Sequence, residues 1–362
     1  MKTNSARSHL IILLLLSVSC MRNTNTQDKT IIKIADFIEI QVDSPFEILS
    51  GDPTFVLLSP GEDYSYGFSK TLRVEYIKNK IYIQEYGKHK LLVYDDSGNP
   101  VLKLDYKGRG PNEYLQITDF DVDTDGNIWI ADAQKNKLFK YSDAGIMLES
   151  WPYRSEVAKI CCLNNNRFLY GIANWDYSEF AGTALAIADS TSNIQSSILS
   201  YPERNDPNYG FSSVFSRTGN SVFYNWPVDD NLYEVSYDGE LLNTYYFDFG
   251  SLSVPEKWRS NLELFESFLP NYLFLVHSSQ VTPEYVVTGM SNSVDRFSVI
   301  MDREKKEAAY FNENTSGYSL VGQYDSGSVW RIDTNCDLDD LPSYVGEWLN
   351  NGGDVLAFIP FE

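Results

Sequence analysis

Positive charge is scarce in this sequence: its 362 residues carry 29 Lys and Arg against 50 Asp and Glu, for a formal net charge of −21. Nucleic-acid binding depends on clustered Lys and Arg that neutralise phosphates, and no basic stripe occurs along the chain. The composition therefore excludes nucleic acid as a partner. The length suits one large domain or two ordinary ones, so it leaves the number of domains open.

Histidine is scarcer still. After the first few residues only His89 and His277 remain, too few for a multi-histidine metal centre. A Gly-x-Ser-x-Gly elbow, a phosphate-binding loop and a dinucleotide fingerprint are also missing. These absences argue against the common enzyme classes, although carboxylates alone could still hold calcium around a channel.

Cysteine is rare as well. Apart from Cys20 the sequence contains Cys161, Cys162 and Cys336, an odd number. The adjacent pair would point to opposite faces of a strand, so a disulfide framework is not expected. We expect small buried apolar side chains, and a single bridge to Cys336 stays open as the alternative.

The N-terminal apolar run, "LIILLLL" at residues 10–16, is far shorter than the roughly 20 residues that a membrane-spanning helix needs. Two basic residues precede it, so residues 1–19 are predicted to be an export signal peptide. The ending "SVSC" resembles a bacterial lipobox, with Ser17 where Leu is usual. The prediction is that Cys20 is lipidated, and an ordinary cleaved signal is the alternative.

Residues 21–30 are polar and featureless, which predicts a flexible tether over residues 20–33 before a folded domain at 34–362. Acidic residues just after a lipidated Cys direct surface export in some Gram-negative groups, and none occurs here before Asp28. We therefore expect an exported monomer, held to the outer membrane of a Gram-negative bacterium by its lipid alone, with the periplasmic face favoured.

Internal repeats predict the fold. "KIYIQEYGKHKLLVYDDSGNPVLKL" (80–104) and "NIWIADAQKNKLFKYSDAGIMLESW" (127–151) share an alternating strand, a polar loop, a second strand, an Asp-x-x-Gly type turn and a third strand. Looser copies occupy residues 167–199, 221–249, 285–311 and 318–333. Units of about 40 to 50 residues with this pattern are typical of β-propeller blades, so we predict an all-β, six-bladed β-propeller of four-stranded antiparallel blades.

Strands from the two ends of the chain are expected to close the ring, because pairing removes open sheet edges. The candidates are "FIEIQV" (37–42) and "DVLAFIPF" (354–361). Two stretches break the β pattern and are predicted to be short helical insertions, at about 255–269 and 337–351.

The segment "DVDTDGNIWIAD" (121–132) fits the calcium loop of an EF-hand, with Asp121, Asp123 and Asp125 at its first, third and fifth positions. An EF-hand needs a helix on each side, whereas β-alternation occupies both sides here. We therefore predict a tight turn between two strands. Calcium at these three acids is kept as a weak alternative, and no other cofactor is predicted.

Residues 121–145 are similar to an NHL-type propeller repeat. "YKGRGPNEY" (106–114) resembles the Gly-Arg-Gly-Pro-x-Glu-Tyr signature of a family of bacterial six-bladed β-propeller lipoproteins, in which it joins the first blade to the second. The resemblance implies this fold and a lipid anchor, and it implies no established reaction.

The same stretch can be interpreted from its residues. Gly108 and Gly110 permit unusual backbone angles, and Arg109 could pair with Glu113 across the turn and fix it. A rigid connection between blades is the first interpretation. The alternative is that Arg109 points into the central funnel and grips an anionic ligand with its planar guanidinium.

Ligands of propellers usually bind on the face that carries the blade connections and the loops between second and third strands. Two such loops contain an Asn-Trp pair, which could form a sugar-stacking surface or pack between blades. The candidate ligand-binding residues are Arg109, Glu113, Tyr114, His89, Asp132, Asn174, Trp175, Asp176, Asn225, Trp226, Asp229, Arg296 and Asp325.

Two functions follow from these observations. The first is a non-enzymatic binding or scaffold lipoprotein whose propeller face holds a glycan, a peptide or an outer-membrane protein partner. The alternative is a calcium-assisted carbohydrate lyase, lactonase or hydrolase at the channel. Converging acids in the channel would favour the enzyme, and aromatic surfaces with scattered amides would favour the binding protein.

Overall fold

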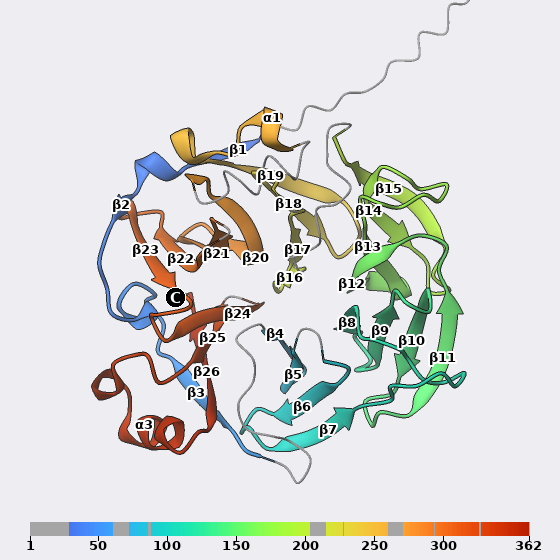
Figure 1. Cartoon of the computed structure of the whole chain (residues 1–362), viewed down its shortest axis with the longest axis horizontal. Helices are drawn as coiled ribbons and strands as arrows, with labels where there is room; N and C mark the ends of the chain where they lie inside the picture. Colours follow the sequence, from blue (N-terminus) through green and yellow to red (C-terminus); the bar gives the residue numbers. More distant parts are fainter. Residues whose placement is uncertain are drawn as a thin grey trace, which may run out of the picture.

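Six sheets surround a central axis in the computed structural model (Figure 1). The structure describes residues 29–60, 72–85, 88–202, 215–226, 228–259, 271–292, 294–325 and 327–361. Each sheet contains an antiparallel four-stranded blade, which confirms the predicted six-bladed β-propeller. Cys20 and the predicted signal peptide lie outside the described residues.

The first three blades follow one another along the chain. Blade 1 contains β4 (Leu72–Ile77), β5 (Lys80–Glu85), β6 (Leu91–Asp95) and β7 (Pro100–Leu104). Blade 2 contains β8 (Asp119–Val122), β9 (Ile128–Asp132), β10 (Lys137–Tyr141) and β11 (Met147–Pro152). Blade 3 contains β12 (Val157–Leu163), β13 (Arg167–Ile172), β14 (Thr183–Ala188) and β15 (Ile194–Ser200).

The other three blades complete the ring. Blade 4 contains β16 (Ser216–Arg217), β17 (Ser221–Tyr224), β18 (Asn231–Ser236) and β19 (Leu241–Asp248). Blade 5 contains β20 (Phe274–Val281), β21 (Tyr285–Ser291), β22 (Arg296–Asp302) and β23 (Glu307–Asn312). Blade 6 contains β24 (Tyr318–Tyr324), β25 (Gly327–Ile332), β26 (Asp354–Pro360) and β3 (Thr54–Leu58). The first strand of each blade lies nearest the axis (Figure 1).

The N-terminal segment runs along the outer edges of three blades. β1 (Thr30–Lys33) pairs in parallel with β19, β2 (Ile38–Glu39) pairs in parallel with β23, and β3 pairs antiparallel with β26. The prediction that residues 37–42 close the ring was therefore wrong, because β3 takes that place. Val56 and Leu58 of β3 are buried, whereas Ile38 of β2 is 70% exposed. The predicted tether is also too long, because Thr30–Lys33 belong to a sheet and Ile32 is buried.

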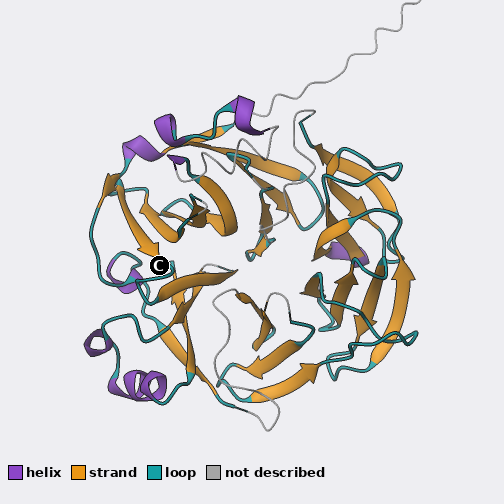
Figure 2. Ribbon diagram, in the orientation of Figure 1, coloured by secondary structure: helices purple, strands orange, loops and turns teal. Residues whose placement is uncertain are grey.

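Most helical segments lie at the outer edge of the ring, and one short turn lies among the strands of blade 3 (Figure 2). The predicted insertion at 337–351 is confirmed as η6 (Leu338–Asp340) and α3 (Ser343–Asn350), and Val345 and Leu349 of α3 are buried in the core cluster that includes β26. The predicted insertion at 255–269 starts with α1 (Glu256–Arg259), and residues 260–270 lie outside the described part of the chain. Short 3₁₀ turns are η1 (Ile34–Asp36), η2 (Pro45–Glu47), η3 (Asn164–Asn166) and η4 (Gly250–Leu252).

Apolar side chains fill the spaces between neighbouring blades. Phe120 of blade 2 packs with Tyr82 of blade 1, for example, and both are buried. Cys161, Cys162 and Cys336 are buried, free and in three different apolar clusters. The cysteines are therefore core side chains, as predicted, and the bridge to Cys336 does not form.

The two faces of the propeller carry different connections. On the face that we call the hairpin face, turns join first to second and third to fourth strands within a blade. On the opposite crossover face, loops join second to third strands and one blade to the next. Residues 323–328 join β24 to β25, the first two strands of blade 6, so they lie on the hairpin face. Asp325 was predicted on the crossover face, and this placement was wrong because the sixth repeat starts one strand earlier than the others.

Candidate ligand-binding site

The acidic segment at 121–132 forms a turn between β8 and β9, as predicted. Asp123 accepts hydrogen bonds from Asn127 N at 2.8 Å and from Trp129 Nε1 at 2.9 Å, which ties the turn to the blade. Asp121 is buried and pairs with Arg217, whereas Asp125 is exposed. Within the described ranges no three His, Cys, Asp or Glu are grouped as metal ligands, and calcium remains an untested prediction.

The connection "YKGRGPNEY" forms hydrogen bonds that fix the path of the chain between blades 1 and 2. Glu113 Oε2 accepts a hydrogen bond from Gly110 N at 2.7 Å, and a Cβ at Gly108 would lie 1.9 Å from the same oxygen. Tyr114 is fully buried and donates from its hydroxyl to His89 O at 2.9 Å. The predicted pair between Arg109 and Glu113 was wrong: Arg109 is exposed, and Glu113 binds backbone instead.

Several predicted ligand residues on the crossover face hold loops in place. Asp132 is buried and accepts from Leu115 N at 2.6 Å and Gln134 N at 2.9 Å. Asp176 is buried and accepts from Glu156 N at 2.9 Å. His89 is half-buried, and Arg296 is exposed. The structure does not bring these residues together into one site.

The two Asn-Trp pairs differ. Trp226 is buried and stacks on Tyr233 with ring centroids 4.8 Å apart, and Asn225 is buried beside it. This pair packs in the core rather than presenting a sugar-stacking surface, so the alternative interpretation holds there. Asn174 and Trp175 are half-buried in the β13–β14 loop.

One pocket does gather predicted residues on the crossover face. A cavity of about 360 Å³ lies between the β17–β18 loop and the segment that contains α1, and its lining includes Trp226 and Asp229. We call it the rim pocket. Burial raises the pKa of Asp229 to about 6, although Tyr233 and Asn231 donate hydrogen bonds to this carboxylate.

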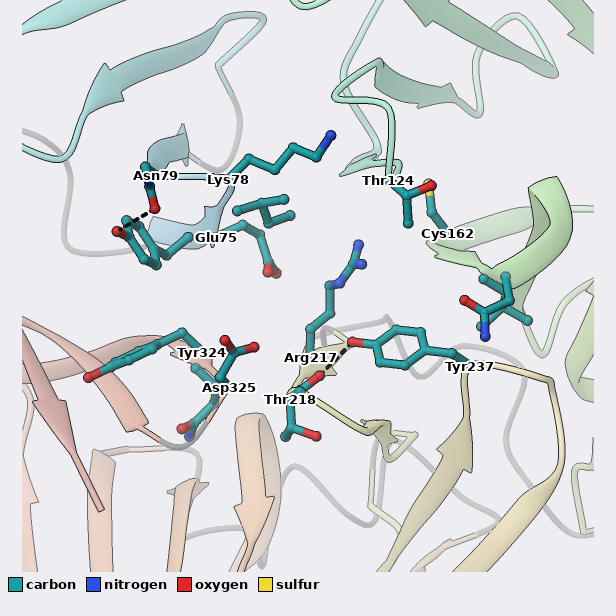
Figure 3. Close-up of a pocket in the computed structure, with 16 residues that line it drawn as sticks. Glu75, Lys78, Asn79, Thr124, Cys162, Arg217, Thr218, Tyr237, Tyr324 and Asp325 are labelled. Atoms are coloured by element: carbon teal, nitrogen blue, oxygen red, sulfur yellow. Dashed lines mark hydrogen bonds between the residues drawn. The ribbon is translucent and has the colours of Figure 1, made fainter. Parts of the chain in front are cut away.

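A second cavity, of about 410 Å³, opens at the axis on the hairpin face, and five blades contribute to its lining. We call it the axial cavity. Figure 3 shows Glu75, Lys78, Arg217 and Asp325 around the same opening, from blades 1, 4 and 6. Asp325 is thus part of a cavity, although on the other face from the predicted one.

The first strands supply buried charges beside this cavity. Arg73 of β4 pairs with Glu75 at 3.0 Å and with Asp119 of β8. Lys159 of β12 lies 4.0 Å from Asp119, and all four side chains are buried. Burial raises the pKa of Glu75 to about 7, against the lowering effect of the Arg73 charge, and burial lowers the pKa of Lys159. Three blades are therefore linked by one network of ion pairs.

Arg217 of β16 reaches across the axis to blade 2. Its Nη1 donates to Asp121 Oδ1 at 2.6 Å, to Asp121 Oδ2 at 2.7 Å and to Val122 O at 3.1 Å. The guanidinium lies over the Tyr237 ring, 5.5 Å from its centroid. The pair fixes Arg217 in the wall of the cavity, with its other nitrogens beside Tyr237.

Uncharged polar groups complete the wall. Gln323 of β24 is buried and lines the cavity. Its Nε2 donates to Ser278 O at 2.8 Å, while its Oε1 has no hydrogen-bond partner among the described residues. Tyr76, Tyr237 and Tyr324 add aromatic area, and Tyr237 donates to Thr218 O at 2.7 Å (Figure 3). Tyrosines with scattered amides are the lining expected of a binding surface rather than of a metal centre.

Sequence reasoning missed Glu75, Lys78, Arg217 and Gln323. The repeats were recognised from second, third and fourth strands, so most first strands stood outside the pattern. A signal was present: "RVE" at 73–75 and "DFD" at 119–121 place charged residues at alternate positions of a strand. In a first strand, those positions line the axis.

Taken together, the fold and the cavity define a six-bladed β-propeller with a polar axial cavity. The sequence matches the family model described as "Domain of unknown function (DUF4934)" over residues 68–351, and the chain belongs to this family. A search of curated proteins found no match.

Two solved structures share the fold. A Bacteroides fragilis protein described as exported superimposes with a TM-score of 0.72 and 16% identity, over 92% of this chain and 100% of that one. A DUF4221 family member from Bacteroides vulgatus gives a TM-score of 0.52 and 12% identity, over 87% and 97%. At these identities the likeness shows the fold alone. None of the helices in the described ranges is long and apolar enough to cross a bilayer.

Proposed function

We propose that this protein is a non-enzymatic binding protein, and that its axial cavity holds a polar ligand, an oligosaccharide. The observation that carries the proposal is the lining: two acids and two bases, Glu75, Asp325, Lys78 and Arg217, share the wall with tyrosines and amides. The charges balance, which suits a ligand that is polar but has no net charge. A volume of about 410 Å³ is in the range of small-molecule sites.

Gln323 supports this choice of ligand. No residue in the described part of the chain donates to its buried Oε1, and a buried acceptor without a partner costs about 1–3 kcal/mol. A sugar hydroxyl is both a donor and an acceptor, so it can satisfy Gln323 and still accept from Arg217 or Lys78. The tyrosine rings offer the apolar faces on which sugar rings stack.

The test is a thermal-shift screen of residues 21–362, a fragment that retains every described strand, against an oligosaccharide panel. Ligand that binds only the folded state raises the unfolding midpoint by mass action. An increase with sugars that is indifferent to EDTA is expected. A decrease with EDTA that calcium restores would instead favour the calcium-assisted enzyme, and an increase with peptides alone would replace the sugar by a peptide.

Matched variants locate the site. Lys78 (φ 52°) and Lys306 (φ 59°) both have left-handed backbone conformations in hairpin turns, but only Lys78 lines the axial cavity. Lys78→Asn is expected to weaken sugar binding about tenfold, and Lys306→Asn, with the same loss of charge, is expected to leave it unchanged. Equal effects of the two variants would remove the axial cavity as the site.

We further propose that the chain is exported and anchored by lipid at Cys20 to the outer membrane, with the propeller on the periplasmic face. Its likeness in fold to an exported protein and the apolar N-terminal run support this location. Cell fractionation tests it: the intact chain should sediment with membranes, and Cys20→Ala should appear in the soluble fraction. A membrane-bound Cys20→Ala variant would contradict the lipid anchor.

A further inference from the structure

The rim pocket on the crossover face is separate from the axial cavity, and most of its charged lining residues are acidic. Among the described residues, its lining contains three acids, Asp229, Asp230 and Glu256, and one base, Arg259. The charges of Asp248 and Glu256 both raise the pKa of Asp230, after the larger effect of its burial. A net negative wall of this kind attracts a cation.

The single base in the pocket is already committed to the protein. Arg259 Nη2 donates to Asp230 Oδ2 at 2.6 Å, Nε donates to Val254 O at 3.1 Å, and Nη1 donates to Val228 O. These bonds tie the segment after blade 4 to the β17–β18 loop. A guanidinium used in this way offers little to an anionic ligand, so the pocket is not a site for carboxylate or phosphate.

Asp230 carries the observation that points to a ligand. The residue is 4% exposed and lines the pocket, and no described residue donates a hydrogen bond to its Oδ1. A buried carboxylate oxygen is stable only when a donor reaches it. Arg259 holds the other oxygen, and a donor on a ligand inside the pocket would satisfy Oδ1.

The chain's own Lys29 shows what kind of donor the rim accepts. Lys29 Nζ donates to Asn231 Oδ1 at 3.0 Å and lies 5.9 Å from the ring centroid of Tyr246. Asn231 and Tyr246 both line the rim pocket. An amide oxygen, an aromatic ring and carboxylates are the groups with which proteins surround an ammonium ion.

We infer that the rim pocket binds the primary ammonium group of a small ligand, with Asp230 Oδ1 as its main acceptor. Asp229 and Glu256 add negative charge around the ammonium group. Lys29 at the rim presents the same group and therefore competes with a ligand. Two sources share this chemistry, an amino sugar and the free amino terminus of a short peptide.

Calorimetric titration of residues 21–362 at pH 7.5 tests the inference. The probes are glucosamine and triglycine amide, with N-acetylglucosamine and N-acetyl-triglycine amide as matched ligands that lack the ammonium group. Each free amine that fits the pocket is expected to bind at least tenfold more tightly than its acetylated form. Equal binding of both forms, or no binding of either amine at millimolar concentration, would overturn the inference, and a preference for one amine identifies the source.

Variants connect the binding to this pocket. Asp230→Asn is expected to weaken amine binding at least tenfold. Because this change also disturbs the 2.6 Å pair with Arg259, the second variant is Glu256→Gln, with an expected threefold loss. Glu256 is exposed, and its distance to Arg259 is longer, at 3.9 Å. Unchanged affinity in both variants would overturn the inference. Lys78→Asn in the axial cavity should have no effect on amine binding, which separates this site from the proposed sugar site.

Lys29 supplies the last arm of the experiment. Lys29→Ala removes the competing ammonium and is expected to tighten amine binding a few-fold. Lys33→Ala is the matched control, because Lys33 is exposed at the other end of β1 and the variant loses the same charge. Weaker binding in Lys29→Ala, or equal tightening in both variants, would contradict the competing role of Lys29.

Discussion

The axial cavity and the rim pocket are similar in size, about 410 and 360 Å³, and each holds a buried acid beside an arginine. They differ in origin. The axial cavity is built by side chains from five blades, whereas the rim pocket is built by one blade and the segments that join it to its neighbours. The balance of charge differs as well, with two acids and two bases in one lining and three acids and one base in the other.

This difference is the reason that we propose two ligand chemistries for one propeller. The first strands of neighbouring blades lie close together around the axis, so their charges pair across blade boundaries and cancel. The rim pocket has fewer neighbours, and among its described lining residues only Arg259, from the segment after blade 4, offsets the charges of Asp229, Asp230 and Glu256. The axial cavity therefore suits a neutral polar ligand, and the rim pocket suits a cation.

The largest effect is expected from breaking the axial charge network. Asp119→Ala leaves Arg73 and Lys159 buried without their shared counterion, and removes an acceptor from Ile160 N at 2.8 Å. Losing one partner of a buried ion pair costs about 3–5 kcal/mol. We expect a loss of this size in the free energy of unfolding, measured with urea.

The control for that experiment is an exposed acid on the hairpin face. Asp143, with its side chain 65% exposed, lies 4.0 Å from Lys80 Nζ. Asp143→Ala is expected to change stability by less than about 0.5 kcal/mol, since exposed ion pairs contribute little. Similar losses in both variants would show that the buried network is not what links the blades.

The comparison also explains what could be predicted from the sequence. Trp226 and Asp229 of the rim pocket lie in the same loop, residues 225–231, so a local sequence pattern was enough to select them. Glu75, Arg217 and Gln323 of the axial cavity come from β4, β16 and β24. Only the closed ring brings these strands together, and no local pattern carries that information.

The assignment of strands to blades from the sequence had the same limit. Alternation and turns identified the blades, because strand period and turn residues are local properties. The choice of the N-terminal strand that closes the ring depends instead on contacts between residues far apart in the sequence. "FIEIQV" alternates and "TFVLL" is a short apolar run, so both are typical of strands, and only packing against β26 favours Val56 and Leu58.

The second prediction compares the titration of the two buried acids. Burial raises the pKa of Glu75 from 4.5 to about 7 in the folded state, and that of Asp229 from 3.8 to about 6. In each case the folded state binds the proton more tightly, so stability falls as pH rises from the unfolded to the folded pKa. Each fall is on the order of 3 kcal/mol, because one pKa unit corresponds to about 1.4 kcal/mol.

Variants with an uncharged side chain separate the pH ranges over which the two acids affect stability. Glu75→Gln is expected to flatten the decrease in unfolding free energy between pH 4.5 and 7. Asp229→Asn is expected to act between pH 3.8 and 6 only. Urea unfolding across this pH range measures both. Variant curves that run parallel to the parent curve would contradict the raised pKa values.

A smaller effect is expected from removing the hydrogen bonds that hold the segment after blade 4 against the β17–β18 loop at the rim pocket. Arg259→Met keeps the apolar stem but removes donors to Asp230 and to two backbone carbonyls, Val228 O and Val254 O. Arg259 is partly exposed, so water can replace some of these bonds, and we expect a loss of about 2 kcal/mol. Thermal unfolding measures the loss, and sugar binding in the axial cavity should be retained. A simultaneous loss of sugar binding would show that the two cavities are coupled.

The smallest effect concerns the turn beside the axial cavity. Lys78 has a left-handed backbone conformation (φ 52°), which disfavours a long side chain, whereas Asn adopts it more readily. Lys78→Asn is therefore expected to stabilise the fold by roughly 0.5 kcal/mol while it weakens ligand binding. Lys306→Asn (φ 59°) should stabilise to a similar extent without the loss of binding. If both variants are more stable and only Lys78→Asn binds ligand more weakly, the strained backbone at this turn serves ligand binding. If Lys78→Asn is less stable than the parent, the lysine stabilises the axial cavity itself.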